Sequence, residues 1–142
     1  MNFEQYQNYL IDTATSLLSI DSTSGFTAKV TDYLIDTVKE LGYPVYKNNI
    51  GNVIVTVEGE DDSEPVALSA HVDTLGLMVR SITSDGMLMI TSIGSPLLPS
   101  LDGEYCNIHT RDGRVYTGTI LSLSPAVHVF PDASTRDRDE QN

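Results

Sequence analysis

The sequence predicts a chain of mixed α/β class, in which a partial α/β domain is followed by a small antiparallel, barrel-like β module. Three observations indicate this. Up to Leu41 the chain carries two apolar stripes at helical spacing. Beyond Pro44 the apolar pattern changes to that of strands. After Gly76 short strands follow one another with tight turns and no helix between them, which is typical of small antiparallel barrels.

Both predicted helices place apolar residues at steps of three and four. The first covers residues 3–20 and the second about 27–41. Residues 21–25, Asp-Ser-Thr-Ser-Gly, are turn formers and separate the two helices. Gly42 is suited to the first position after the second helix, and Pro44 prevents the helix from continuing.

Strands are predicted over residues 45–48, 52–57 and 65–71, with an acidic turn at 59–64 before the last of them. They are apolar and β-branched on both faces, which is typical of central strands covered on both sides. Two helices and about three strands are too few to cover both faces of a sheet. We therefore expect further chain after residue 142, the alternative being a complete small protein with a loose tail.

The pattern after Gly76 predicts hairpins. Asp85-Gly86 and Asp112-Gly113 stand in hairpin-turn positions. The predicted strands are 77–82, 87–93, 104–110 and 115–121. A boundary near Gly76 divides the chain into residues 1–76 and a β module of residues 77–130, and the polar residues 131–142 are expected to be a disordered or unfinished tail.

The amino-acid composition excludes some classes of binding partner. The net charge is −12, with 20 acidic and 8 basic residues, which argues against nucleic acid and against an anionic membrane surface. Simple solubility explains the acidic surface. A single cysteine, Cys106, suits a reducing compartment, and we expect it to be structural rather than nucleophilic. With no signal-peptide or membrane-span pattern visible, the cytoplasm is the expected location.

His71 and Asp73 are the strongest candidates for a functional site, because they stand at the carboxyl end of the predicted strand 65–71. In extended chain, residues two apart point to the same side. A neutral imidazole is a good ligand for zinc or cobalt. Asp73 could accept a hydrogen bond from the other ring N–H, bind a metal itself or orient a catalytic group. His-x-Asp is common by chance, so a strand-end histidine beside a carboxylate, with no metal, is the plain alternative.

Other polar residues give weaker signals. His109 stands in a predicted strand beside a turn, and we expect it to face solvent. His128 follows Pro125 at a strand end, where a loop histidine is the simpler interpretation. The sequence contains no calcium loop of the EF-hand kind, no nucleophile elbow and no phosphate loop.

Ser69–Val79, reading SAHVDTLGLMV, resembles the first metal motif of the glutamyl and deblocking aminopeptidases, two-metal exopeptidases that form tetrahedral dodecamers. Upstream, Ser22–Gly25 resembles the family's Pro-Ser-Gly-type turn, and Gly51–Ile54 resembles its Gly-Asn-hydrophobic strand. Three further segments resemble its inserted β domain: Gly86–Ile90, Ile93–Gly94 and Gly113–Ile120. Ser124–His128 falls where the family has a Pro-Pro-His turn. The likeness covers nearly all of residues 10–130.

The resemblance implies a metalloaminopeptidase, with this chain as the N-terminal part of its α/β metallopeptidase-type domain. His71 would bind one of two divalent ions, zinc or cobalt, and Asp73 would orient it and support catalysis. The substrates would be peptides with a free N-terminus, and the inserted β domain would mediate oligomer contacts. The other ligands and the general base would lie beyond residue 142, so we expect the 142-residue chain alone to be inactive.

Two positions depart from the family pattern. Thr74 stands where the family commonly has Glu, and Ser95 stands where a second Gly is usual, which suggests altered specificity or interfaces. Two alternatives stay open. One is a related His-x-Asp zinc carboxypeptidase or amidohydrolase, although those usually continue with a Val-Pro-like turn rather than with Gly76-Leu77. The other is a non-catalytic β module for assembly, which would explain the chain length.

Overall fold

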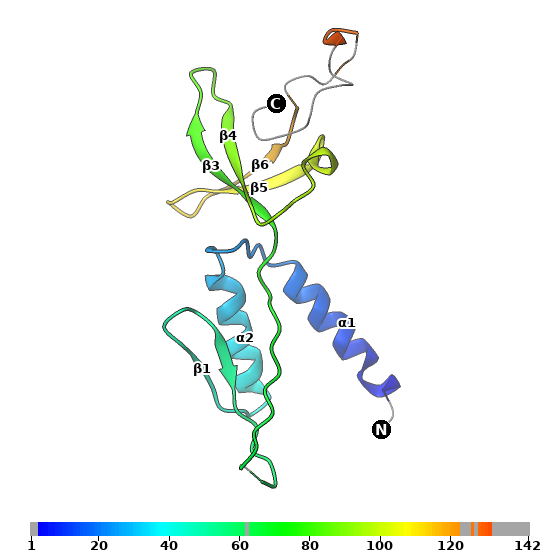
Figure 1. Cartoon of the computed structure of the whole chain (residues 1–142), viewed down its shortest axis with the longest axis vertical. Helices are drawn as coiled ribbons and strands as arrows, with labels where there is room; N and C mark the ends of the chain where they lie inside the picture. Colours follow the sequence, from blue (N-terminus) through cyan, green and yellow to red (C-terminus); the bar gives the residue numbers. More distant parts are fainter. Residues whose placement is uncertain (1–2, 62, 123–125, 127, 132–142) are drawn as a thin grey trace. The chain divides into compact units, whose positions relative to one another are not determined.

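The computed structural model describes residues 3–61, 63–122, 126 and 128–131 (Figure 1). The chain divides into two compact units, one up to Gly76 and the other from Leu77 onward. Helices occur in the first unit and hairpins in both, so the mixed helix and strand character predicted from the sequence is confirmed. No helix among the described residues is long and apolar enough to cross a membrane.

The two predicted helices are present as α1 (Glu4–Leu18) and α2 (Ala28–Glu40). After α2, Gly42 adopts φ +84°. Its N–H donates to the carbonyl of Lys39, and the N–H of Tyr43 donates to that of Val38, which is the Schellman pattern that glycine favours. The predicted helix end is therefore confirmed.

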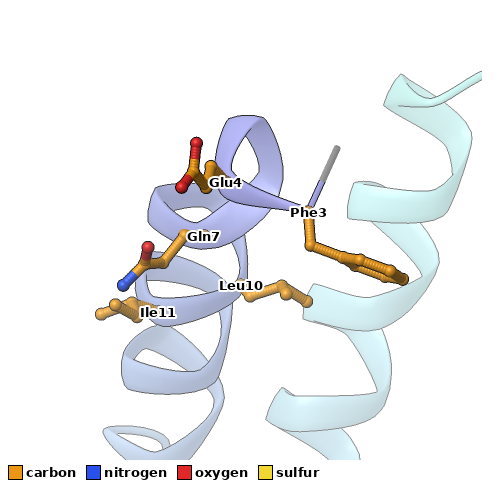
Figure 2. Close-up of a pocket in the computed structure, with 5 residues that line it drawn as sticks. All are labelled: Phe3, Glu4, Gln7, Leu10 and Ile11. Carbon is orange, nitrogen blue, oxygen red and sulfur yellow. The ribbon is translucent and has the colours of Figure 1, made fainter. Parts of the chain in front are cut away.

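The helices differ in how they are covered. α2 contributes the buried residues Val30 and Thr31, and it contacts strands β1 (Val45–Lys47) and β2 (Val53–Val55). α1 contributes no buried residue. Phe3, which precedes α1, and Leu10 and Ile11 in its first turns line a shallow, mostly apolar hollow together with Glu4 and Gln7 (Figure 2). The stripe predicted for α1 is therefore apolar, but the described residues do not cover it.

Strands β1 (Val45–Lys47) and β2 (Val53–Val55) form an antiparallel hairpin in which Tyr46 is opposite Ile54. The side chain of Asn48 accepts hydrogen bonds from the backbone N–H groups of Ile50 and Asn52, and this closes the turn. Both strands were predicted, but each is shorter than the sequence pattern suggested.

The prediction of a central strand over residues 65–71 is wrong. This segment contains no strand, and Val66 and Leu68 are 89% and 97% exposed. A strand needs neighbours that pair with its N–H and C=O groups. Among the described strands, β1 and β2 pair only with each other, so residues 65–71 have no partner. The expectation of strands covered on both faces also fails, because neither β1 nor β2 contains a buried residue.

The second unit is built from hairpins. β3 (Gly76–Ile82) pairs with β4 (Leu88–Ile93), and β5 (Tyr105–His109) pairs with β6 (Val115–Thr119), with the short 3-10 helix η1 (Leu98–Leu101) between them. Both predicted hairpins are confirmed. The described strands form three two-stranded sheets and no closed sheet, so the barrel-like form stays a prediction.

The two hairpin turns have the same construction. In each, a Thr hydroxyl donates to the side chain of the Asp two residues later: Thr83 to Asp85, and Thr110 to Asp112. A glycine with positive φ follows each Asp, Gly86 at +88° and Gly113 at +83°. This geometry is typical of three-residue hairpin loops. The predicted tail, residues 131–142, falls outside the described residues except for Pro131.

Candidate functional site

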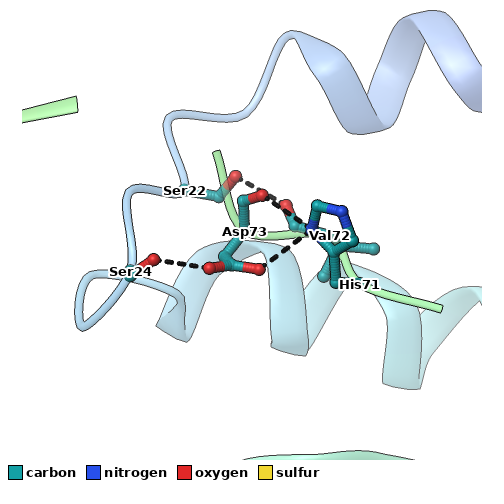
Figure 3. Close-up of polar contacts among 5 residues, drawn as sticks. All are labelled: Ser22, Ser24, His71, Val72 and Asp73. Atoms are coloured by element: carbon teal, nitrogen blue, oxygen red, sulfur yellow. Dashed lines mark hydrogen bonds and ion pairs between the residues drawn. The ribbon is translucent and has the colours of Figure 1, made fainter. Parts of the chain in front are cut away.

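His71 and Asp73 lie together in the segment that leads into β3 (Figure 3). The Nδ1 atom of His71 is 3.1 Å from Oδ1 of Asp73 and 3.2 Å from the Asp73 carbonyl oxygen. The His71 side chain is 86% exposed and that of Asp73 40%. The two side chains therefore approach each other as predicted, although the segment before them is not a strand.

Two further residues contact this segment from the turn between the helices. The hydroxyl of Ser24 donates to Oδ2 of Asp73 at 2.5 Å. The hydroxyl of Ser22 donates to the carbonyl oxygen of Val72 at 2.9 Å (Figure 3). Sequence analysis did not assign either serine to the site. The available signal was the polar composition of the turn and its resemblance to a family motif.

The hydrogen bond from Ser24 lowers the pKa of Asp73 below its ordinary value of 3.8, and the hydrogen bond from His71 lowers it further. Both donors favour the charged carboxylate. Asp73 is therefore ionised at neutral pH. One of its oxygens can accept a hydrogen bond from Nδ1–H of His71, while the other accepts one from Ser24.

The His71 and Asp73 pair fits one part of a metal centre. With Nδ1 directed at a carboxylate, the other ring nitrogen, Nε2, is left for a ligand, as in carboxylate–histidine–zinc arrangements. Within the described part of the chain, no group of three or more His, Cys, Asp or Glu residues could hold a metal ion. The described residues therefore fit one ligand and its orienting carboxylate, but not a complete centre.

The remaining candidates lie in the second unit. His109 is half-buried in β5, opposite Val115. The prediction that it faces solvent is therefore wrong. His128 is exposed in a turn, as expected of a loop histidine, and part of the surrounding Ser124–His128 motif falls outside the described residues. Cys106 is half-buried in β5, opposite Gly118.

Solved structures similar to this chain include an aminopeptidase and a dodecamer. An aminopeptidase of the archaeon Desulfurococcus kamchatkensis matches with a TM-score of 0.74 and 29% identity, over 80% of this chain and 31% of that one. The dodecameric PhTET1-12s matches with a TM-score of 0.70 and 28% identity, over 84% of this chain and 35% of that one.

Residues 51–142 match the family model described as M42 glutamyl aminopeptidase, which is more than half of the chain. The chain therefore belongs to the M42 glutamyl aminopeptidase family. YhfE, a proposed aminopeptidase of Bacillus subtilis, is 44% identical over 126 residues, which are 89% of this chain and 36% of YhfE. The chain thus spans about a third of the length of the relatives it matches (36%, 31% and 35%).

Proposed function

We propose that this chain supplies the N-terminal part of a metal-dependent aminopeptidase that releases N-terminal residues from peptides. Residues 1–76 would belong to its α/β catalytic domain, and residues 77–130 to an inserted, barrel-like β domain. The observation that carries the proposal is the contact between His71 and Asp73, 3.1 Å apart, inside the region that matches the M42 family.

In this proposal His71 binds one of two divalent ions, zinc or cobalt, through Nε2. The ions, when bound, supply Lewis-acid activation of water and polarise the scissile carbonyl. Asp73 accepts a hydrogen bond from Nδ1–H, which keeps the Nε2 lone pair available to the metal and makes the imidazole more basic. Asp73 thus supports catalysis by orienting a ligand.

One imidazole and one carboxylate cannot hold two metal ions, since zinc alone commonly takes three protein ligands in catalytic sites. The described residues bring no third metal-binding group to His71. We therefore propose that the isolated 142-residue chain does not hydrolyse peptides. Chelator-sensitive release of amino acids by the purified chain, lost in His71→Ala, would contradict this.

Assembly and location are part of the same proposal. The dodecameric state of PhTET1-12s supports a homo-oligomer, up to a dodecamer, with contacts through the β domain. The single, free Cys106 supports work in a reducing compartment such as the cytoplasm.

The central test is His71→Ala in the polypeptide encoded by the whole reading frame. We expect loss of aminopeptidase activity on amino-acid anilides and loss of bound metal, measured by mass spectrometry of metals. His128→Ala is the matched control, because it removes an exposed turn histidine, and it is expected to retain both properties. Unchanged activity and metal content in His71→Ala would refute the assignment of the site.

A further inference from the structure

The turn between the two helices is fastened to the backbone on both sides of Asp73. Ser22, which has no exposed surface, donates its hydroxyl to the carbonyl oxygen of Val72 at 2.9 Å. The carbonyl oxygen of Ser22 accepts the N–H of Thr74 at 3.0 Å. Because both flanking peptide groups are held, the backbone position of Asp73 is set by the turn.

The same turn also holds the Asp73 side chain. Ser24 Oγ donates to Oδ2 at 2.5 Å, and Oδ1 lies 3.1 Å from Nδ1 of His71 (Figure 3). The two oxygens of one carboxylate therefore have different partners. Rotation of the carboxylate away from His71 would cost the hydrogen bond to Ser24, so this bond restrains the carboxylate plane.

A third contact shows how closely the turn and the segment fit. Thr23 forms a parallel bridge with Thr74. A Cβ atom added to Gly76 would lie 2.1 Å from Oγ1 of Thr23, which is well inside van der Waals contact. The backbone at Gly76 thus approaches Thr23 to a distance that a side chain at position 76 would prevent.

We propose that Ser24 is a positioning residue: it holds Oδ1 of Asp73 against Nδ1 of His71 and so fixes the tautomer and direction of the imidazole. Ser22 and Thr23 hold Ser24 in register with Asp73. This inference rests on the proposed role of His71 as a metal ligand. Loss of such an outer partner typically lowers metal affinity or activity about 10- to 100-fold.

The first experiment needs no metal. Nitrogen-15 NMR of the 142-residue chain at about pH 8.5, in alkaline buffer that keeps imidazole neutral, reports which ring nitrogen carries the proton. We expect the Nδ1–H form of His71 to dominate in the wild type and in Ser24→Thr, which keeps the hydroxyl. Ser24→Ala is expected to give a mixture of tautomers. Ser100→Ala, which removes an exposed hydroxyl from the second unit, is the control.

The second experiment uses the polypeptide of the whole reading frame and titrates zinc against a chromogenic chelator. Ser24→Ala is expected to weaken zinc binding about 10-fold and to lower kcat with little change in KM, and Ser24→Thr is expected to restore both. If Ser24→Ala lowers the thermal midpoint, Ser24→Cys gives the same comparison, because a thiol has a similar shape but is a weaker donor.

The outcomes separate the two proposals. Wild-type tautomers and zinc affinity in Ser24→Ala, with zinc lost in His71→Ala, would overturn the role of Ser24 and leave the metal site standing. Zinc binding that persists in His71→Ala would overturn the metal site. The metal-free NMR comparison would then still decide whether Ser24 orients His71 through Asp73.

Discussion

Ser22 has no exposed surface, and its hydroxyl donates a 2.9 Å hydrogen bond to the carbonyl oxygen of Val72, 50 positions further along the chain. A buried hydroxyl is costly to the folded state unless it is paired. The bond therefore stabilises the first unit while it locates the peptide group next to Asp73. Changes at this point should affect folding first, and the position of Asp73 through it.

Ser22→Ala is expected to lower the free energy of unfolding by about 1–3 kcal/mol, because the carbonyl oxygen of Val72 loses its donor in a partly buried place. Urea titration followed by circular dichroism measures the change. Ser19→Ala is the matched control, since the exposed hydroxyl of Ser19 donates only within its own helix end, to Ser16. Equal midpoints for the two variants would show that the buried bond contributes nothing.

Gly76→Ala is expected to destabilise the first unit by about 1–3 kcal/mol, the usual range for overpacking. The new Cβ would lie 2.1 Å from Oγ1, 2.7 Å from Cγ2 and 2.9 Å from Cβ of Thr23. Thr23→Gly removes all three atoms, so the double variant should recover part of the loss. A double-mutant cycle on thermal midpoints measures this coupling. Additive effects would mean that the two residues do not clash.

The sequence predicted those features that depend on neighbours close in the chain. Helical spacing placed α1 and α2, Gly42 marked the end of α2, and two Asp-Gly pairs located the hairpins. The segment 65–71 could not be predicted in this way, since its apolar pattern indicates a buried environment but does not supply a pairing strand.

In the candidate site too, only contacts between residues close in the chain could be predicted. The approach of His71 to Asp73 follows from their separation of two residues and was predicted. The contacts of Ser22 and Ser24 were not, because hydrogen bonds between residues about 50 positions apart (50 and 49) leave no periodic pattern in a single sequence. Such partners become visible only when the backbone brings the two segments together.

The hairpin turn at Asp112 should show a pH dependence. The hydrogen bond from Arg114, followed by that from Thr110, lowers the pKa of Asp112 below 3.8. A carboxyl group whose pKa is lowered in the folded state stabilises that state at pH values above the pKa of the unfolded chain. This contribution is lost as the pH falls through the folded pKa. The turn is therefore expected to lose stability only below about pH 4.

Arg114→Gln is expected to raise the pKa of Asp112 toward 3.8, measured by carbon-13 NMR titration of the carboxyl carbon. The chain contains its own control. Asp85 has the same Thr-based turn, and its lowered pKa is caused mainly by Thr83, so Arg114→Gln should leave it unchanged. An unchanged pKa of Asp112 in Arg114→Gln would mean that the 2.8 Å contact with Arg114 does not persist in solution.

The 142-residue chain on its own is expected to self-associate at high concentration. Val66 and Leu68 are almost fully exposed in a segment without a pairing strand, and such apolar, unpaired backbone promotes association. Static light scattering should show a mass that rises with concentration. The double variant Val66→Lys/Leu68→Lys should shift this rise to higher concentration, because two charges oppose the packing of this segment against another copy.

Two added lysines change the net charge from −12 to −10, which by itself weakens the repulsion between copies, so the control must change the charge equally. Asn49→Lys/Ser84→Lys adds the same two charges at exposed turn positions. If both double variants change association equally, general charge rather than the exposed segment governs it. A wild-type chain that stays monomeric at every concentration would contradict the prediction, and would mean that residues 65–71 cover their apolar side chains within the monomer.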